Sequence, residues 1–181
     1  MPARRYVRRS SEVAARFAFF DVERHTDVPE GEAGRERVAY TLKFADWVAV
    51  AAVTEDGRFV LVRQHRHGVG HETLETAGGI VDPGEAPAEA AARELREESG
   101  FAGASIEPLG FVHPNAAMQD NRCFLFLVRG AREVAPVETD EFESTEPVLL
   151  TRGELERALE EGSVSHVLSV VALERALARL R

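Results

Sequence analysis

Three glutamates stand at a spacing that suits metal-assisted chemistry. Glu94, Glu97 and Glu98 occupy positions i, i+3 and i+4 of a segment with helical periodicity, so their side chains leave one face of a helix. Like charges at this spacing destabilise an isolated helix by roughly a few tenths of a kcal/mol per pair. Oxygen ligands around a hard divalent cation reverse that effect, and Mg²⁺ keeps water and substrate phosphates among its ligands. The cluster therefore predicts a magnesium site open to a phosphate substrate.

The same residue types also suit a simpler role. Solvated helix faces commonly carry such charges, and Arg93 forms an ordinary i,i+4 pair with Glu97. The segment before the helix favours catalysis, because Gly78 and Gly79 form a turn that is followed by a fixed step to Glu85. Packing of the helix alone does not require that loop.

The segment GGIVDPGEAPAEAAARELREESGF, residues 78–101, resembles the signature of the Nudix hydrolases. That signature is Gly, five residues, Glu, seven residues, then Arg-Glu-apolar-any-Glu-Glu-any-Gly-apolar. The chain matches every fixed position with Gly79, Glu85, Arg93, Glu94, Leu95, Glu97, Glu98, Gly100 and Phe101. The resemblance implies the α/β class, with a Nudix α/β/α sandwich built on a mixed β-sheet.

The resemblance also implies a role for each motif residue. Mg²⁺ or Mn²⁺ is expected to bind Glu94, Glu97, Glu98 and the main-chain carbonyl of Gly78. Arg93 is expected to orient a glutamate, Glu85 to support it, and Gly79 and Gly100 to shape the backbone. Such metal ions neutralise a diphosphate and lower the pKa of a bound water, while charge builds on the phosphoryl oxygens in the transition state.

The flanks of the motif resemble the branch that hydrolyses ADP-ribose and other nucleoside diphosphate sugars to a nucleoside monophosphate and a sugar phosphate. Residues 62–79 resemble the lead-in of that branch, and residues 1–44 resemble its N-terminal β extension, which implies a homodimer with composite sites. The hydrolase domain is expected over residues 45–181. Phe19, Phe20 or Tyr40 is a candidate to stack the base, and plain core packing is the alternative for each. Enzymes that act on ADP-ribose usually carry a marker proline beyond the motif, and Pro114 stands slightly earlier than that position. Other sugar nucleotides, such as GDP-mannose, therefore remain open as substrates.

The general base is expected on a late acidic loop. The run from Glu138 to Glu143 occupies the matching place, and Glu141 and Glu143 are the candidates, beside Glu97 on the helix. A solvated acidic loop is the alternative. Arg63 and Arg66 are candidates to bind phosphate or the terminal ribose, and surface ion pairs are the alternative for both.

Two other residue patterns suggest different chemistry. His65, His67 and His71 lie close together and raise a zinc site as an alternative, but no cysteine or further histidine stands nearby, which favours turn residues. For Cys123 no charged activator of the thiol is evident, so this residue is expected to pack in the core or in a strand instead of acting as a nucleophile.

Composition narrows the functional classes. The chain of 181 residues is 44% hydrophobic and 29% charged, as in globular proteins, and lacks a run of about 20 apolar residues, so we expect no membrane span. Its net charge of −9 argues against a nucleic-acid partner. The single cysteine and the absence of a signal-peptide pattern predict a cytoplasmic location. Other Nudix chemistries remain as alternatives, on dinucleotides, oxidised nucleotides or RNA caps, as does a non-catalytic nucleotide-binding domain.

Periodicity predicts the elements that position these residues. An N-terminal β-hairpin is expected from strands over 13–22 and 35–44, with residues 1–12 frayed and a polar turn over 25–34. Strands are expected over 47–53, 58–63, 73–77, 105–113 and 121–128. Helices are expected over 86–99, 152–161 and 168–180.

Overall fold

The computed structural model describes residues 4–31, 34–138 and 144–181, which form two compact units. One unit contains residues 1–45 and 113–121, and the other contains residues 46–112 and 122–181. None of the helices within these described ranges is long and apolar enough to cross a membrane.

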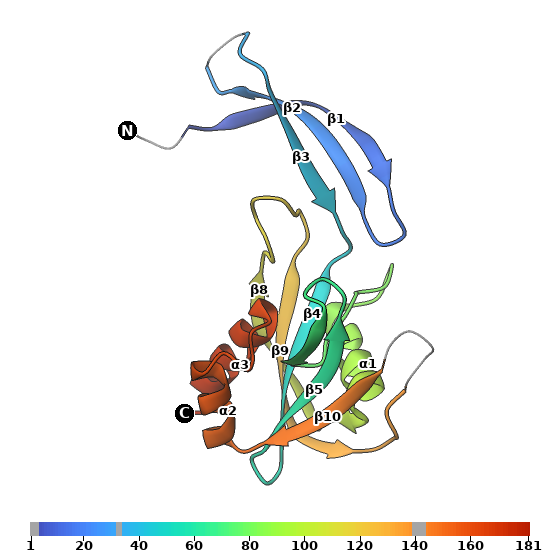
Figure 1. The fold of residues 1–181 in the computed structure, drawn as a ribbon, viewed down its shortest axis with the longest axis vertical. Helices are drawn as coiled ribbons and strands as arrows, with labels where there is room; N and C mark the ends of the chain where they lie inside the picture. Colours follow the sequence, from blue (N-terminus) through green and yellow to red (C-terminus); the bar gives the residue numbers. More distant parts are fainter. Residues whose placement is uncertain (1–3, 32–33, 139–143) are drawn as a thin grey trace. The chain divides into compact units, whose positions relative to one another are not determined.

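The N-terminal unit carries a three-stranded antiparallel sheet in the order β1-β2-β3 (Figure 1). Its strands are β1 (Tyr6–Arg16), β2 (Asp21–Pro29) and β3 (Arg37–Lys43). The predicted antiparallel extension is confirmed, but its predicted boundaries are wrong. Residues 6–12 form a strand, the tight turn lies at residues 17–20, and residues 25–29 belong to β2 and not to a turn. Nearly all of β1 is exposed, so its sequence lacks the apolar alternation that marks a half-buried strand.

The larger unit is built on a mixed sheet. Its main path is β10-β5-β4-β9-β7, with β6 paired to β5 and β8 paired to β9. The strands are β4 (Trp47–Thr54), β5 (Phe59–Arg66), β6 (His71–Glu75), β7 (Phe101–Ala102), β8 (Ser105–Val112), β9 (Cys123–Glu133) and β10 (Thr145–Leu150). Strands β4 and β9 run parallel while the other pairs run antiparallel, so the predicted mixed sheet is confirmed.

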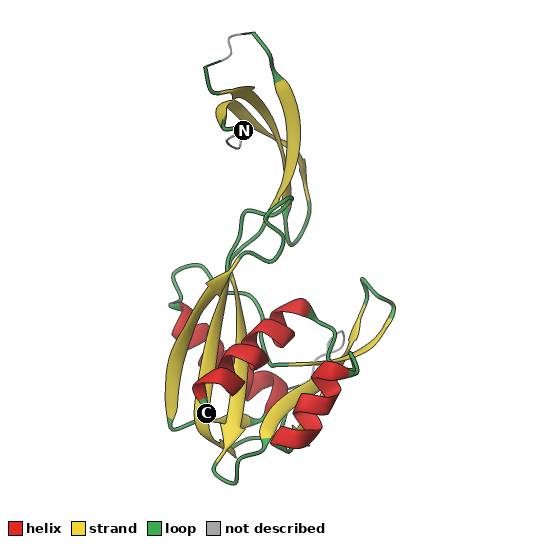
Figure 2. Ribbon diagram, turned by 90° about the vertical axis from the view of Figure 1, so that its left-hand side faces the viewer, coloured by secondary structure: helices red, strands yellow, loops and turns green. Residues whose placement is uncertain are grey.

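Helices cover both faces of this sheet (Figures 1 and 2). They are α1 (Pro87–Ser99), α2 (Arg152–Glu160) and α3 (Val167–Arg179). Alternate residues of β4 explain the layers, because Val48 and Val50 belong to the core under α1, whereas Ala51 belongs to the core under α2 and α3. The predicted α/β/α sandwich is therefore confirmed.

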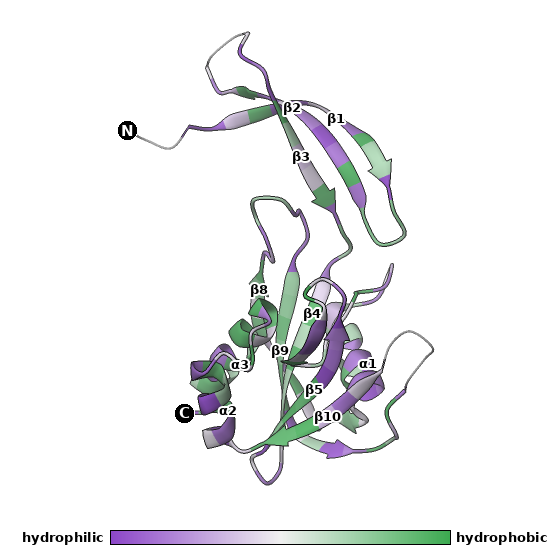
Figure 3. Ribbon diagram, in the orientation of Figure 1, coloured by the Kyte–Doolittle hydropathy of each residue, from purple (hydrophilic) through white to green (hydrophobic). Residues whose placement is uncertain are grey.

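Hydropathy along the strands shows where buried apolar residues give way to polar residues. Figure 3 shows hydrophobic colouring along the first part of β9 and hydrophilic colouring toward the end of β5. At that end of β5 the sequence changes from Val62 to Arg63-Gln-His-Arg66. The strand thus begins in the core and ends with polar residues at the turn to β6, where Arg66 pairs with His71.

Candidate active site

The glutamate cluster lies on α1, and local sequence determines where this helix begins and ends. Pro87 occupies the first turn, where its missing N–H has no intrahelical partner to lose. The Glu89 carboxylate accepts a hydrogen bond of 3.1 Å from the Ala86 N–H. Gly100 ends the helix in the left-handed region at φ 76°. A Cβ there would overlap the carbonyl oxygen of Ala135, so both backbone conformation and close packing require this motif glycine.

The two glycines before the helix run along β4 and face the glutamates. The carbonyls of Ala77 and Gly79 accept hydrogen bonds of 2.8 and 2.9 Å from β4. The Gly78 N–H donates to Glu98 Oε2 at 2.8 Å. The backbone of Gly78, whose carbonyl is predicted as a metal ligand, therefore contacts Glu98 through its N–H.

Arg93 connects the other acidic residues of the motif. It donates twice to Glu85, from Nε and Nη2, at 3.0 Å each. Its Nη1 donates to Glu94 at 2.8 Å and to Glu97 at 3.2 Å, and its Nη2 also donates to the carbonyl of Ile80 at 3.0 Å. One guanidinium thus links the loop before α1 to two of the three helix glutamates.

These contacts favour the charged forms of Glu85 and Arg93. Hydrogen bonds from Arg93 hold the pKa of Glu85 below its usual value. In turn, the bond to Glu85, followed by those to Glu94 and Glu97, raises the pKa of Arg93 despite an opposing effect of burial. The loop is also held locally, since Glu85 Oε2 accepts from the Asp82 N–H at 3.1 Å. The supporting roles of Arg93 and Glu85 stay predictions, which these contacts support.

The donor set suits a hard divalent cation. Carboxylate oxygens and a main-chain carbonyl are the ligands that Mg²⁺ and Mn²⁺ prefer. The glycine also matches this purpose, because a Cβ at Gly79 would lie 2.5 Å from Cδ of Glu94, within the space that the carboxylate occupies. Among the described residues no three His, Cys, Asp or Glu side chains enclose an ion-sized position. Here Glu94 and Glu97 contact Arg93 and Glu98 contacts Gly78, so the metal assignment stays a prediction.

The predicted base residues Glu141 and Glu143 lie outside the described residues. The residues described on either side of them are bound to α1. The N–H of Glu138 donates to the carbonyl of Glu97 at 2.8 Å, and the Thr145 hydroxyl donates to the carbonyl of Glu98 at 2.7 Å. The described residues Glu138 and Thr145 are therefore both tied to the last turn of the glutamate helix.

The two candidate substrate arginines differ in their surroundings. Arg63 forms an exposed ion pair with Glu146 of β10 at 3.1 Å. Arg66 forms a bidentate pair with Glu75, with distances of 3.0 and 2.8 Å, and the Glu75 side chain is only 1% exposed. A guanidinium held by a buried carboxylate has a defined orientation, whereas the exposed pair contributes little.

Sequence reasoning missed a buried polar network around Glu75. The carboxylate also contacts Thr73 Oγ1 at 2.6 Å and His166 Nδ1 at 2.8 Å. Ser169 Oγ on α3 accepts from the N–H of Thr76 at 3.0 Å. An acidic residue inside a short strand was the available signal, but its partner His166 lies 91 positions later in the sequence.

The aromatic candidates belong to the N-terminal unit. The Phe20 ring packs between those of Phe17 and Phe44, with centroid distances of 4.9 and 5.1 Å. Phe19 is 76% exposed and Tyr40 is 58% exposed. Packing explains Phe20, while the exposed rings keep base stacking as a prediction.

The histidine and cysteine patterns show no second reaction centre. The rings of His65 and His67 lie 5.3 Å apart, but no metal-holding group of three exists in the ranges that the structure describes. Cys123 is fully buried, and burial, with a smaller effect of Asp46, raises the pKa of its thiol to about 12. Its predicted packing role therefore agrees with the structure.

The family follows from a model of the NUDIX domain, which matches residues 43–168. The chain belongs to the Nudix family. Its curated relatives include the ADP-ribose pyrophosphatase of Bacillus subtilis (strain 168), 28% identical over 119 residues that cover 64% of this chain. They also include the ADP-ribose pyrophosphatase of Mycobacterium tuberculosis, 35% identical over 92 residues that cover 50% of this chain. The matches span 63% and 44% of these two proteins, less than two thirds of each.

A solved structure supports the fold of this Nudix protein over nearly its full length. A crystal structure described as ADP compounds hydrolase superposes with a TM-score of 0.83. It covers 99% of this chain and 96% of that chain at 23% identity. At this identity the likeness establishes the Nudix fold with its N-terminal extension.

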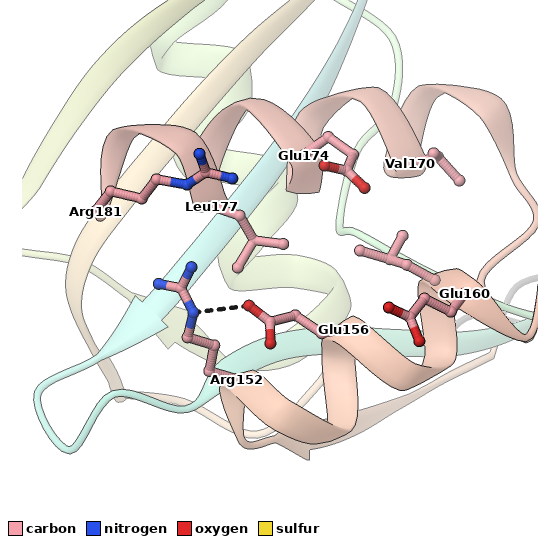
Figure 4. Close-up of a pocket in the computed structure, with 8 residues that line it drawn as sticks. Arg152, Glu156, Glu160, Val170, Glu174, Leu177 and Arg181 are labelled. Carbon is pink, nitrogen blue, oxygen red and sulfur yellow. Dashed lines mark hydrogen bonds and ion pairs between the residues drawn. The ribbon is translucent and has the colours of Figure 1, made fainter.

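The larger unit also has a hollow away from the motif glutamates on α1. Figure 4 shows it between α2 and α3, where Arg152 pairs with Glu156 at 2.8 Å. Its volume is about 270 Å³. It is lined by Arg152, Glu156, Leu159, Glu160, Val170, Glu174, Leu177 and Arg181. Mixed charges over an aliphatic floor do not form a phosphate site, so the motif glutamates remain the candidate centre.

Proposed function

We propose that this protein is a divalent-metal-dependent hydrolase of nucleoside diphosphate sugars, with ADP-ribose as the first candidate substrate. Water would add to one phosphorus of the diphosphate as the bond from that phosphorus to the bridging oxygen breaks. The products would be a nucleoside monophosphate and a sugar phosphate. For ADP-ribose these are AMP and ribose 5-phosphate.

The observation that carries the proposal is the apposition of the Gly78–Gly79 segment and the helix glutamates. The N–H of Gly78 contacts Glu98, and the carboxylate of Glu94 occupies the space beside Gly79 where another residue would place a side chain. A glycine pair that admits carboxylates is unnecessary for a solvated helix face. It is expected where carboxylates and a main-chain carbonyl hold one ion.

The residues of this chain would then divide the work. Glu94, Glu97, Glu98 and the Gly78 carbonyl would hold Mg²⁺ or Mn²⁺, which supplies charge neutralisation and acidifies bound water. Arg93 would orient Glu94 and Glu97 through the contacts described above. We assign proton removal from the attacking water to Glu141, or to Glu143, since the described residues that flank them in the sequence, Glu138 and Thr145, bond to the last turn of α1.

The substrate class rests on the relatives and on the charge of the protein. Two curated relatives are ADP-ribose pyrophosphatases. At a net charge of −9, the chain is poorly suited to a long polyanion such as capped RNA. We further propose a homodimer joined through residues 1–44, in which Phe19 or Tyr40 stacks on the base, and a cytoplasmic location that suits the lone Cys123.

Product analysis tests the proposal. The purified protein is incubated with Mg²⁺ and, separately, ADP-ribose, GDP-mannose, NADH and an oxidised nucleoside triphosphate, and products are identified by mass spectrometry. We expect a monophosphate and a sugar phosphate, with ADP-ribose or another sugar nucleotide turned over fastest. The matched control is Glu98→Gln, which should be at least tenfold slower because a ligand is lost. Exclusive cleavage of the triphosphate or dinucleotide would contradict the proposed substrate class.

A further inference from the structure

The buried carboxylate of Glu75 lies at the end of β6, outside the Nudix signature. It holds Arg66 through two hydrogen bonds of 3.0 and 2.8 Å and receives a third from Thr73 at 2.6 Å. His166 Nδ1 lies 2.8 Å from the same Oε2 atom that contacts Arg66 Nη2. One carboxylate thus joins a residue of β5 to the residue that precedes α3.

The network keeps Glu75 charged. Burial by itself would raise the pKa of its carboxyl group, but hydrogen bonds from His166, Arg66 and Thr73 more than offset that effect and hold the pKa well below its usual value. A buried charge at a protein's interior requires such partners, and losing one leaves the others to readjust. The geometry of Arg66 therefore depends on every donor to this carboxylate.

His166 also contacts α3. Its Nδ1 also lies 3.1 Å from Ser169 Oγ on the first turn of α3. That hydroxyl in turn accepts from the N–H of Thr76 at 3.0 Å. His166 therefore sits at a junction of α3 with the strand that leads to the glycine pair.

Arg66 combines a fixed orientation with access to solvent. Its side chain is 39% exposed although its Nε and Nη2 atoms bind Glu75. A guanidinium held on one edge by a buried carboxylate is suited to meet a phosphate oxygen with little loss of side-chain freedom. Arg63, on the same strand as Arg66, lacks this support because the side chain of its partner Glu146 is 68% exposed.

We propose that His166 is a positioning residue for substrate binding, which holds Glu75 so that Arg66 is presented to a phosphate of the nucleoside diphosphate. This inference rests on the proposed function for the identity of the ligand. It predicts that removing the His166 side chain weakens substrate binding, and that this effect requires Arg66. A purely structural role for His166, as a tie between α3 and β6, predicts a change in stability without that dependence.

A double-mutant cycle separates these roles. The variants are His166→Ala, Arg66→Ala, the double variant and His166→Asn, whose side-chain amide keeps a donor near the Nδ1 position. For each, kcat and KM are measured with ADP-ribose and Mg²⁺. Binding of α,β-methylene-ADP, whose diphosphate cannot be cleaved, is measured by calorimetry with Mg²⁺. Thermal unfolding is followed alongside as the measure of folding.

The expected pattern is specific. His166→Ala should raise KM and the analogue's Kd by about tenfold with kcat within about twofold, the scale of one charge-assisted hydrogen bond. The same change should add less than about twofold in the Arg66→Ala background, and His166→Asn should stay within about threefold of wild type.

Three results would overturn the inference. These are an unchanged KM and Kd in His166→Ala, an equal effect of that change with and without Arg66, or wild-type affinity in Arg66→Ala. Turnover of ADP-ribose in any of these cases would leave the proposed function standing. Conversely, analogue binding that depends on His166 through Arg66, in a protein that hydrolyses no sugar nucleotide, would support the positioning role and reject the proposed function.

Discussion

Replacing Gly79 by alanine separates the chemical role of the glycine pair from its structural role. The added Cβ would lie 2.5 Å from Cδ of Glu94, where ordinary contacts begin at 3.4 Å. The carboxylate must therefore move by about 0.9 Å. Because that carboxylate is the end of a flexible side chain, rotation about its own bonds can relieve the overlap without moving the backbone.

The magnitudes follow from this geometry. The φ of Gly79 is not positive, so alanine meets no strain there and gains about 0.4–1 kcal/mol from a less flexible unfolded chain. That gain is offset by the displaced Glu94 and its weakened bond to Arg93, worth about 0.5–1.5 kcal/mol for a pair partly exposed to solvent. We expect unfolding free energies within about 1 kcal/mol of wild type. Turnover should fall by about 10²-fold, the cost of a misplacement near 1 Å in a catalytic group.

Urea unfolding measures the stability of Gly79→Ala, an ADP-ribose assay measures its turnover, and calorimetric titration with Mg²⁺ measures its metal affinity. Gly78→Ala is the matched control, because its Cβ would overlap the backbone carbonyl oxygen of Val48 and lie 3.1 Å from Cα of Ala49. No side-chain rotation relieves that overlap, so this variant should lose stability first. Wild-type turnover and metal affinity in Gly79→Ala would refute the use of Glu94 as a ligand from its observed position.

Four further outcomes are expected. Glu141→Gln should lower kcat by about 10²-fold with little change in metal affinity, and near-normal kcat would remove it as the base. Because the folded state lowers the pKa of Glu75 below its ordinary 4.5, the carboxylate stabilises the fold above that pH and the effect is lost as pH falls; the stability difference between wild type and Glu75→Gln should therefore shrink from neutral pH to about pH 3 in urea titrations. Light scattering at a protein concentration of about tens of micromolar should show a dimer, since Phe19 and Tyr40 are exposed on the N-terminal unit. A monodisperse monomer would contradict the composite site. Cys123 should resist thiol reagents at neutral pH until the protein unfolds, and labelling of the native protein would refute its burial.

The motif region was predictable because its signals are local. The helix expected over 86–99 is observed as Pro87–Ser99, since Pro87 and Gly100 mark its two ends. The shared face of Glu94, Glu97 and Glu98 follows from helical spacing alone. Local sequence also set the strands of the core, where apolar runs such as β4 are buried along their length.

Other parts depend on partners far away in the chain. Strand β10 carries Pro147 among mixed residues and was not predicted, but it pairs as an edge strand with β5, where proline is tolerated. Strand β1 is exposed and polar, so only its pairing with β2 makes it a strand. The role of Glu75 required His166, which the sequence places in a different element. Periodicity carries no information about such contacts.

The N-terminal unit is assembled from two stretches of chain that are synthesised far apart in time. The N–H of Leu42 donates to the carbonyl of Met118 at 2.7 Å, and the Phe44 N–H donates to the Asp120 carboxylate at 3.3 Å. On a ribosome the first 45 residues emerge early, yet these bonds cannot form until residue 121 has left the exit tunnel. Until then, the edge of β3 has no partner from residues 113–121, and an open strand edge invites pairing with another chain. A variant that removes this unit, or transfers it to another protein, must therefore include residues 113–121. Truncation at residue 45 alone would leave these residues in the chain without the strands that they contact.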